Sequence, residues 1–297
     1  MTQSIFCRDC PGPGEPARAT AAGDGRQARI GAALERIRYK LVVMSGKGGV
    51  GKSTVAVNVT CSLAAGGART GLLDVDLHGP SVPRMLGLDG ALTAGGQAAI
   101  APMRFGERLL VVSMQSLLAD PDAAVLWRGP MKTTAIRQFI ADVDWGELDY
   151  LVIDSPPGTG DEHLTVLKTV PDALTLLVTT PQEISLADVR KTINFLQYAK
   201  ANILGVVENM SGLVCPRCGQ DIELFKKGGG EALARDFGLE FLGAVPLDPA
   251  TVAAGDLGRP VALLPGAHPA KTAFAALADN VAAACRASLE AAASPRP

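Results

Sequence analysis

The residues most able to do chemistry lie at positions 46–54, where the sequence GKGGVGKST contains the frame G-x-x-x-x-G-K-S. Glycines in this frame let consecutive backbone N–H groups turn toward an anion, and a helix that begins near Lys52 adds the positive end of its dipole. We expect Lys52 to neutralise the β- and γ-phosphates of ATP and the Ser53 hydroxyl to bind Mg²⁺. The predicted phosphate loop comprises Gly46, Lys47, Gly48, Gly49, Val50, Gly51, Lys52, Ser53 and Thr54.

A phosphate loop needs a strand before it and a helix after it. YKLVVMS is an apolar run typical of a buried strand, and STVAVNVTCSLAAG carries apolar residues at helical spacing. Amphipathic segments separate six further apolar runs, a pattern typical of parallel strands that helices cover on both faces. The runs lie at 69–76, 108–114, 149–155, 174–180, 202–210 and 239–246. The pattern predicts a doubly wound, mostly parallel α/β fold of the P-loop NTPase type over residues 38–290.

Composition and charge limit what the chain can bind. It has 297 residues, 47% hydrophobic and 20% charged, with a formal net charge of −2, so no basic excess favours nucleic acid. No apolar run approaches the roughly 18 residues of a membrane-spanning helix. The N-terminal sequence lacks the basic-then-apolar layout of a signal peptide, so we expect a cytoplasmic protein. Residues 1–30, rich in Gly, Pro, Ala and Arg, are expected to be a flexible tail that carries Cys7 and Cys10, followed by a short helix at 30–40.

Polar side chains follow three predicted strands at their carboxyl ends, where open α/β sheets bind ligands. Asp154 comes after the run YLVI, as in the second motif of phosphate sites, whose carboxylate orders Mg²⁺ and its waters. Asp76 would lie within reach of the γ-phosphate and orient the attacking water. The alternative for both aspartates is a helix cap or a turn. Asn209 ends the third strand, and His78 and His163 fall in loops where they are candidates for contact with phosphate or water.

The sequence LVCPRCGQDIELF at 213–225 is typical of a metal-binding knuckle inserted into the fold. Cys215 and Cys218 have the CxxC spacing that lets two thiolates converge on one ion. Two thiolates do not complete a four-sulfur site, so a second pair would come from the same residues of a partner subunit or from Cys7 and Cys10. Spacing alone is compatible with zinc, with an iron–sulfur cluster or with a redox pair.

The phosphate loop contains a second lysine, Lys47, directly after its first glycine. With it, the loop resembles the deviant form K-G-G-x-x-G-K-[ST] of the ATPases related to MinD, the partition ATPases and the nitrogenase iron protein. In that class the early lysine crosses a dimer interface to the partner's phosphates, much as an arginine finger acts in trans. The resemblance implies a homodimer in which Lys47, Lys52 and Asp76 serve catalysis. The alternative for Lys47 is a solvated loop charge.

Four dispersed segments narrow the resemblance to the Mrp/ApbC-type iron–sulfur cluster carriers: DVDLHGPSVPRMLGL, DYLVIDSPPGTGDEHLT, ENMSGLVCPRCG and GAVPLDP. This resemblance implies that Asp76 belongs to a first switch loop and residues 154–160 to a second one. It also implies that Cys215 and Cys218 of two subunits hold one [4Fe–4S] cluster, which is passed to apo iron–sulfur proteins. The residues that would flank the adenine are Asn209, Pro246 and Asp248.

The alternative function is a positioning ATPase of the MinD or partition kind, in which the cysteine pair holds a structural zinc ion. The C-terminal sequence LADNVAAACRASLEAAASPRP lacks the basic face and bulky apolar anchors of a membrane-targeting helix. No basic patch for DNA is evident either. A reductase like the nitrogenase iron protein places its cysteines differently and lacks CPRCG. We therefore expect a carrier with no nucleic-acid or membrane partner.

Overall fold

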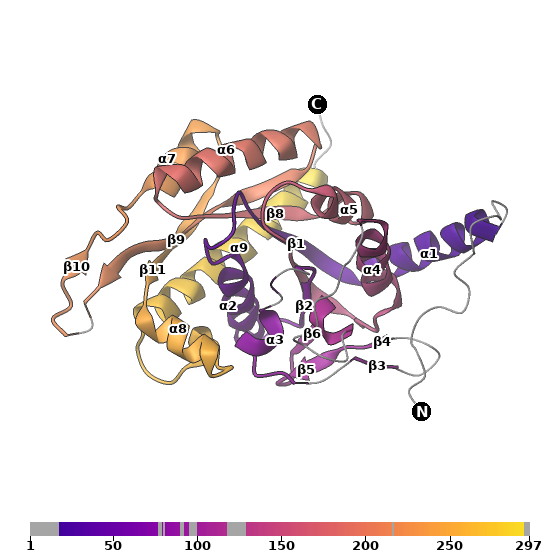
Figure 1. Cartoon of the computed structure of the whole chain (residues 1–297), viewed down its shortest axis with the longest axis horizontal. Coiled ribbons are helices and arrows are strands. Elements are labelled where there is room, and N and C mark those ends of the chain that lie inside the picture. The colour runs from indigo at the N-terminus through magenta and orange to yellow at the C-terminus, as the bar shows by residue number, and fades with distance from the viewer. Residues whose placement is uncertain are drawn as a thin grey trace.

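The computed structural model describes residues 18–76, 79, 81–89, 92–94, 100–117, 129–215 and 217–293. Within these residues the chain forms a nine-stranded sheet in the order β10-β9-β8-β1-β7-β2-β6-β5, and β11 also pairs with β9 (Figure 1). Short antiparallel strands, β5 (Met103–Phe105) and β10 (Asp221–Ile222), lie at the ends of this order, and β3 (Thr93–Ala94) pairs with β4 (Ile100–Ala101) in a separate ladder. The parallel strands are β1 (Ile37–Ser45), β2 (Thr70–Asp74), β6 (Leu109–Ser113), β7 (Leu148–Asp154), β8 (Leu174–Thr179), β9 (Asn202–Val214) and β11 (Phe241–Leu247).

Helices cover both faces of the sheet, which explains why its strands are apolar without alternation. In β1, Leu41 and Val43 belong to one core together with Phe274 of α9, whereas Val42 belongs to the other core with Phe139 of α4. The first face carries α2 (Lys52–Ala65), α3 (Val82–Met85), η3 (Val261–Leu263) and α9 (Pro269–Ala293), with α8 (Pro249–Asp256) beside α3. The second carries α1 (Arg18–Glu35), α4 (Gly129–Asp142), α5 (Asp161–Thr169), α6 (Glu183–Tyr198) and α7 (Gly229–Asp236), and η2 (Met114–Leu117) follows β6. The predicted doubly wound, mostly parallel α/β fold is confirmed.

Strand register brings the chemically important side chains to one edge of the sheet. Asp154 at the end of β7 lies opposite Asp74 of β2 and Val43 of β1, and Asp74 lies opposite Ser113 of β6. The phosphate loop leaves β1 at the same edge, because it starts directly after Ser45. Parallel pairing therefore gathers residues that are far apart in the sequence.

The N-terminal expectation needs a correction. The short helix expected at 30–40 is instead α1, which runs from Arg18 to Glu35, and β1 begins at Ile37. Residues 18–30 are therefore helical rather than part of a tail, and residues 1–17, with Cys7 and Cys10, lie outside the described residues. Tertiary packing explains the difference, because Ile30 is buried in the core shared with α4 and Arg29 pairs with Asp142 of α4 at 3.0 Å.

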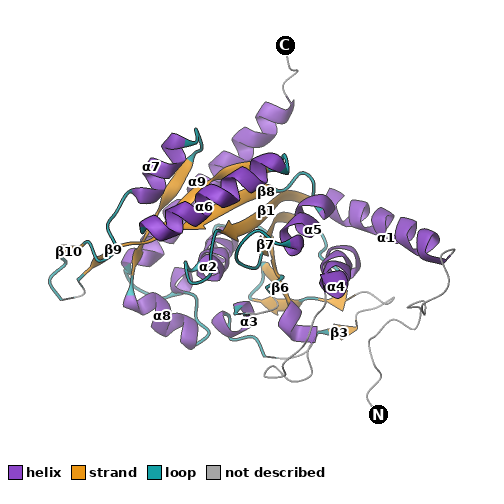
Figure 2. Cartoon of the chain, turned by 45° about the horizontal axis from the view of Figure 1, so that its top comes forward, coloured by secondary structure: helices purple, strands orange, loops and turns teal. Residues whose placement is uncertain are grey.

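The predicted knuckle is the tip of a hairpin formed by β9 and β10. Strand β9 is longer than the expected run at 202–210, since it continues to Val214 and pairs there with Asp221 of β10. In both Figure 1 and Figure 2 this hairpin extends beyond the helices at one edge of the sheet. We call residues 206–228 the cysteine hairpin. No helix in the described part of the chain is long and apolar enough to cross a membrane.

Candidate functional site

The phosphate loop has the geometry of an anion cradle. Gly49 and Gly51 have φ angles of +82° and +80°, which favour glycine. A Cβ on Gly46 would lie 2.4 Å from the backbone of Asp188, so the loop packs directly against α6. Gly51 precedes α2 without a side-chain cap, which leaves the first amides of that helix available for phosphate.

Lys52 and Asp154 form a buried ion pair behind this cradle. The lysine Nζ lies 2.6 Å from Oδ1 of Asp154, and the two side chains are 6% and 0% exposed. Nζ also lies 3.3 Å from the Ser53 hydroxyl. Burial raises the pKa of Asp154, while the charge of Lys52 and a hydrogen bond from Ser53 lower it. The sequence analysis predicted Lys52 at the phosphates and Ser53 and Asp154 at Mg²⁺, and the structure brings the three side chains together.

The second carboxylate oxygen of Asp154 identifies a place for a cation. Oδ2 is buried and has no hydrogen-bond partner in the described part of the chain. A buried carboxylate oxygen without a partner is costly, and next to a serine hydroxyl it offers the hard oxygen ligands that Mg²⁺ prefers. Ser53 and Asp154 therefore fit Mg²⁺, or its bound waters, on an observation independent of the sequence motif.

Asp74 is a member of this cluster that the sequence analysis did not select. Its Oδ1 accepts a hydrogen bond of 3.0 Å from the backbone N–H of Asp76, and its Oδ2 accepts one of 3.0 Å from the Ser113 hydroxyl. Burial, together with the charge of Asp154, raises the pKa of Asp74 to about 8, although the charge of Lys52 and the hydrogen bonds from Asp76 and Ser113 oppose the rise. Burial thus favours the neutral form of this acid. Only the pairing of β2 with β7 would have revealed this role in advance.

Asp76 faces the second switch loop across a hollow of about 420 Å³, which is lined by Asp76, Gly79, Pro156, Pro157, Gly160 and Glu162. The loop is fastened to β1, because the Gly158 N–H donates to the Ser45 carbonyl at 3.0 Å and the Ser155 hydroxyl donates to the Val43 carbonyl at 2.6 Å. Asp76 is largely buried, at 8% exposure. The hollow thus places a carboxylate beside the loop at the edge where phosphate would lie.

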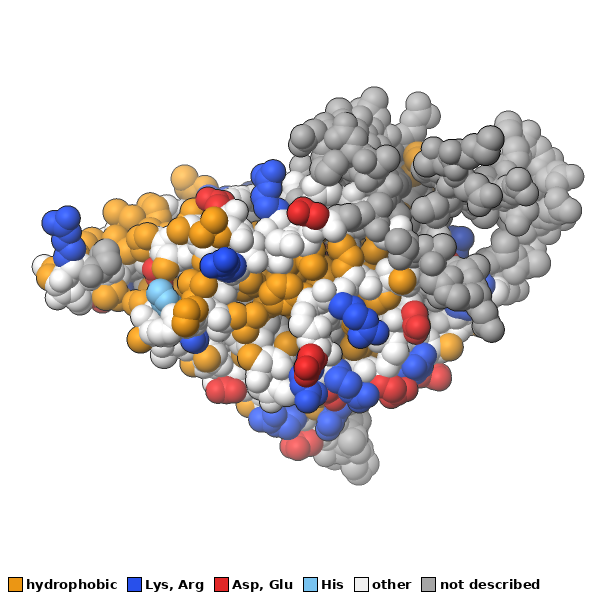
Figure 3. All heavy atoms as spheres, turned by 90° about the horizontal axis from the view of Figure 1, so that it is seen from below, with side chains coloured by type: hydrophobic (Ala, Val, Ile, Leu, Met, Phe, Trp, Pro, Cys, Tyr) orange, Lys and Arg blue, Asp and Glu red, His pale blue; other side chains and the backbone are white. Residues whose placement is uncertain are grey.

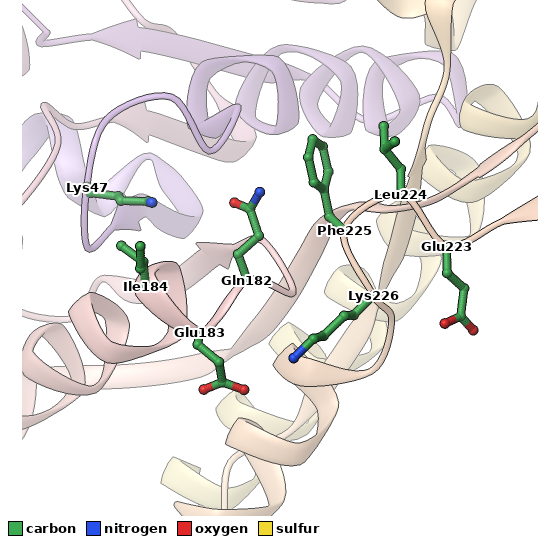
Figure 4. A pocket seen from close by; sticks show the side chains of 8 residues that line it. All are labelled: Lys47, Gln182, Glu183, Ile184, Glu223, Leu224, Phe225 and Lys226. Carbon is green, nitrogen blue, oxygen red and sulfur yellow. The ribbon is translucent and has the colours of Figure 1, made fainter.

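Lys47 has different surroundings from Lys52. It lines a separate, open hollow of about 680 Å³ together with Gln182, Glu183 and Ile184 at the start of α6 and with residues 223–226 of the cysteine hairpin. Figure 4 shows Lys47 extending from the phosphate loop on the side of Gln182 and Ile184, with Leu224 and Phe225 beyond them. Ile184 and Leu224 are 71% and 52% exposed. One hollow is therefore shared by the phosphate loop and the segment that follows the cysteines.

The residues expected at the adenine have structural contacts of their own. The Asn209 amide donates a hydrogen bond of 2.9 Å from Nδ2 to the Val50 carbonyl, which ties β9 to the phosphate loop. Asp248 caps α8, since Oδ1 accepts from the Ala250 N–H at 2.9 Å. Pro246 lies in β11. Their contact with adenine stays a prediction.

Cys215 and Cys218 are free thiols at the tip of the cysteine hairpin. Cys218 is exposed and Cys215 half-buried, and Gly219 has a φ of +72° that allows the tight return of the chain. The Cys215 N–H donates to the Gln220 carbonyl at 2.8 Å and its carbonyl accepts from the Gly219 N–H at 2.9 Å. Hydrogen bonds from the backbone of Cys218 and Arg217 and from the Cys218 thiol lower the pKa of Cys215, which favours the thiolate that binds metal.

This pair needs ligands from elsewhere. The part of the chain that the structure describes contains no cluster of three or more Cys, His, Asp or Glu side chains that could hold a metal ion. Cys61 and Cys285 are buried, and burial raises the pKa of both thiols to about 12, so neither is a ready ligand. A metal ion held by this pair would therefore need further ligands from outside the described residues of one chain.

Comparison with known proteins gives consistent relatives. A family model described as the NUBPL iron-transfer P-loop NTPase, of the ParA type, matches residues 36–282. The chain is 47% identical over 240 residues to the iron-sulfur cluster carrier protein of Methanocaldococcus jannaschii, covering 80% of this chain and 83% of that protein. It is 49% identical over 231 residues to the cytosolic Fe-S cluster assembly factor NUBP2 homolog of Culex quinquefasciatus, covering 76% and 90%.

Solved structures are similar as well. A nucleotide-binding protein from Archaeoglobus fulgidus, in complex with ADP, superposes with a TM-score of 0.70 at 39% identity, covering 78% of this chain and 91% of that chain. The cell division ATPase MinD of Pyrococcus furiosus superposes with a TM-score of 0.60 at 26% identity, covering 82% and 98%. The fold and the nucleotide site thus have relatives of both the carrier and the positioning kinds.

Proposed function

The chain belongs to the NUBPL iron-transfer P-loop NTPase family, and from that premise we propose that it hydrolyses ATP and carries a [4Fe–4S] cluster to apo iron–sulfur proteins. The observation that carries this proposal is that one strand, β9, contacts the phosphate loop through Asn209 and leads into the cysteine knuckle. The proposed nucleotide site and the proposed metal-binding pair therefore share one continuous strand.

At the nucleotide site, Lys52 moves from Asp154 to the β- and γ-phosphates when ATP binds. Ser53 and Asp154 would hold Mg²⁺, which neutralises charge that develops on the phosphates. Asp76 orients the attacking water from the hollow beside the second switch loop. The support is the buried Lys52–Asp154 pair, whose second carboxylate oxygen has no partner within the described residues.

Lys47 completes the site of a partner subunit in a homodimer. Its side chain lines an open hollow apart from the buried Lys52, and the exposed apolar side chain of Ile184 lies in the same hollow. A half-buried lysine and an exposed isoleucine beside a phosphate loop are consistent with a surface that a second copy covers. Hydrolysis therefore depends on association.

The cluster is the cargo, and Cys215 and Cys218 of each subunit supply its ligands. Four thiolates satisfy a [4Fe–4S] cluster, and two-fold symmetry brings two identical pairs together. The base of the cysteine hairpin is firmly held, because the buried Glu208 carboxylate accepts hydrogen bonds from the N–H groups of Gly228 and Gly230 at 3.0 and 2.6 Å. A firm base and an exposed tip suit a site that must present its cargo to an acceptor.

A positioning ATPase with a zinc knuckle is the second candidate, and the similarity to MinD favours it. On the face in Figure 3, however, acidic and basic side chains are interspersed, and no continuous basic field covers the described residues on that face. Anaerobic reconstitution separates the two candidates: iron and sulfide in the dimer, with transfer to an apo-acceptor, support the carrier, while tightly bound zinc and no cluster would support the other. The cytosolic relative suggests the cytosol as the place of action.

A further inference from the structure

His163 lies in the first turn of α5, and its side chain is buried, with 1% exposure. Its two ring nitrogens contact the two ends of the second switch loop. The backbone N–H of Gly160 donates to Nδ1 at 3.1 Å, and Nε2 lies 2.8 Å from the carbonyl oxygen of Pro156. One imidazole therefore closes residues 156–160 into a ring.

The partners determine the tautomer. Because the Gly160 N–H is a donor, Nδ1 must present its lone pair, and Nε2 must then carry the proton that it donates to Pro156. Burial lowers the pKa of His163, with Lys52 opposing and Glu162 favouring the charged ring. With both nitrogens engaged, His163 has no free lone pair with which to take a proton from water.

The contact between His163 and Gly160 resembles one half of a helix capping box. Gly160 is the N-cap of α5 and His163 is the third residue of the helix, a position where Glu or Gln usually reaches back to the N-cap N–H. An imidazole does the same with one nitrogen and has a second nitrogen for the loop. The histidine thus adds a contact with Pro156 to an ordinary helix cap.

The enclosed loop is the wall of the hollow that Asp76 lines. Pro156, Pro157 and Gly160 line that hollow, and the loop is tied to β1 on its other side through Gly158 and Ser155. Misplacement by about 1 Å of groups that position a reactant can cost on the order of 100-fold in rate. Because the second switch loop is held at both ends, the wall that it forms stays at a fixed distance from Asp76.

We propose that His163 is a positioning residue for ATP hydrolysis, which holds the second switch loop in the shape that hydrolysis requires. This role rests on the proposed ATPase activity. It does not involve binding of the nucleotide by His163, because both of its ring nitrogens are engaged by the backbone of Gly160 and Pro156. The role is therefore seen in turnover rather than in affinity.

The test compares His163→Leu, His163→Gln and the wild-type chain. Leucine fills the space and loses both hydrogen bonds, whereas glutamine offers an acceptor for Gly160 and a donor for Pro156. We expect His163→Leu to lower kcat about tenfold or more, with the affinity for MgADP changed less than about twofold, and to speed hydrogen exchange in residues 156–160. We expect His163→Gln to recover most of the kcat and the protection. His268→Leu is the control, since His268 lines neither hollow.

Each outcome decides between roles. A wild-type rate in His163→Leu would overturn the positioning role while leaving the proposed function intact. The positioning role would also be overturned if His163→Leu lost MgADP affinity and melting temperature along with kcat, and if His163→Gln restored none of them. That result would indicate a general role in folding. Absence of turnover in the wild-type chain would refute the ATPase proposal and this role together.

Discussion

Nδ2 of Asn209 donates a hydrogen bond of 2.9 Å to the carbonyl oxygen of Val50, and a Cβ on the neighbouring Gly51 would lie 2.2 Å from the same Nδ2. The phosphate loop is therefore in direct contact with the strand that leads to Cys215. Movement of the loop on nucleotide binding has a short physical route to the cysteine hairpin. This contact couples the two sites only if nucleotide at the phosphate loop and cargo at the cysteine pair both shift the conformation of β9.

Asn209→Ala tests that contact. Leaving the buried Val50 carbonyl without its donor costs about 1–3 kcal/mol. If that cost falls on the nucleotide-bound loop, the affinity for nucleotide should drop by roughly 5- to 150-fold. The ratio of cluster transfer rates with and without ATP should also fall toward one. The matched control is Asn280→Ala on α9, which removes a 2.8 Å bond to the Leu242 carbonyl of β11. Wild-type affinity in Asn209→Ala, measured by titration of MgADP, would contradict the coupling.

Lys52→Ala should abolish MgATP binding and destabilise the unliganded chain. Removing the lysine leaves the buried Asp154 carboxylate unpaired, at a cost on the order of 3–5 kcal/mol in unfolding free energy. Lys40→Ala is the matched control, because Lys40 on β1 pairs at 2.8 Å with Asp172, whose side chain is 60% exposed. Chemical denaturation and nucleotide titration measure both effects. If the two variants lose equal stability and both bind MgATP, the site assignment is wrong.

Lys47→Ala should bind MgATP normally and lose turnover, because the proposed contact of Lys47 forms only between subunits. Specific activity of the wild-type chain should fall on dilution as dimers dissociate. Lys191→Ala serves as the control, since Lys191 on α6 is exposed and pairs only with Asp188 among the ion pairs of the described residues. A specific activity that stays constant down to full monomer, with Lys47→Ala as active as the wild type, would rule out the shared site.

The buried Asp74 beside Asp154 predicts that the stability of the chain depends on pH when neither nucleotide nor Mg²⁺ is bound. Burial raises the pKa of Asp74 to about 8 from an ordinary value of 3.8, so the folded chain keeps a proton there that the unfolded chain loses. Stability from this group is therefore present at low pH and is lost as the pH rises through this window, by up to about 1.4 kcal/mol per pH unit. The side chain that Asp74→Asn introduces cannot ionise. The free energy of unfolding of Asp74→Asn should therefore rise relative to that of the wild type as the pH increases from 5 to 8. A difference between the two that is independent of pH would show that Asp74 is ionised throughout.

The strands and the phosphate loop could be predicted because their signals are local. Buried parallel strands appear as continuous apolar runs, and the loop needs its glycines in a fixed frame. The start of α1 could not be predicted, since Ile30 is held by burial against a helix that comes much later in the chain. The amino-acid composition around Ile30 does not indicate that a later helix packs against it.

The site was predictable to the extent that each residue follows a strand. Asp154 and Asp76 were selected for that reason, but the register that sets Asp74 beside Asp154 is a property of strand pairing. His163 was predicted to lie in a switch loop, and this placement was wrong, because it lies in α5. Both of its ring nitrogens bond to the backbone of the second switch loop. His78 lies outside the described residues.

The central claim is that Cys215 and Cys218 of two subunits hold one transferable [4Fe–4S] cluster. Both thiols lie at the hairpin tip, apart from the buried Lys52 and Asp154, so their loss should spare nucleotide binding. The most direct measurement is iron and sulfide per dimer after anaerobic reconstitution, in the wild type, in Cys215→Ser with Cys218→Ser, and in Cys7→Ser with Cys10→Ser. The account predicts about four irons and four sulfides per dimer in the wild type and in the Cys7/Cys10 variant, and none in the Cys215/Cys218 variant, which still binds MgATP. A cluster that survives without Cys215 and Cys218, or zinc in place of any cluster in the wild type, would contradict it.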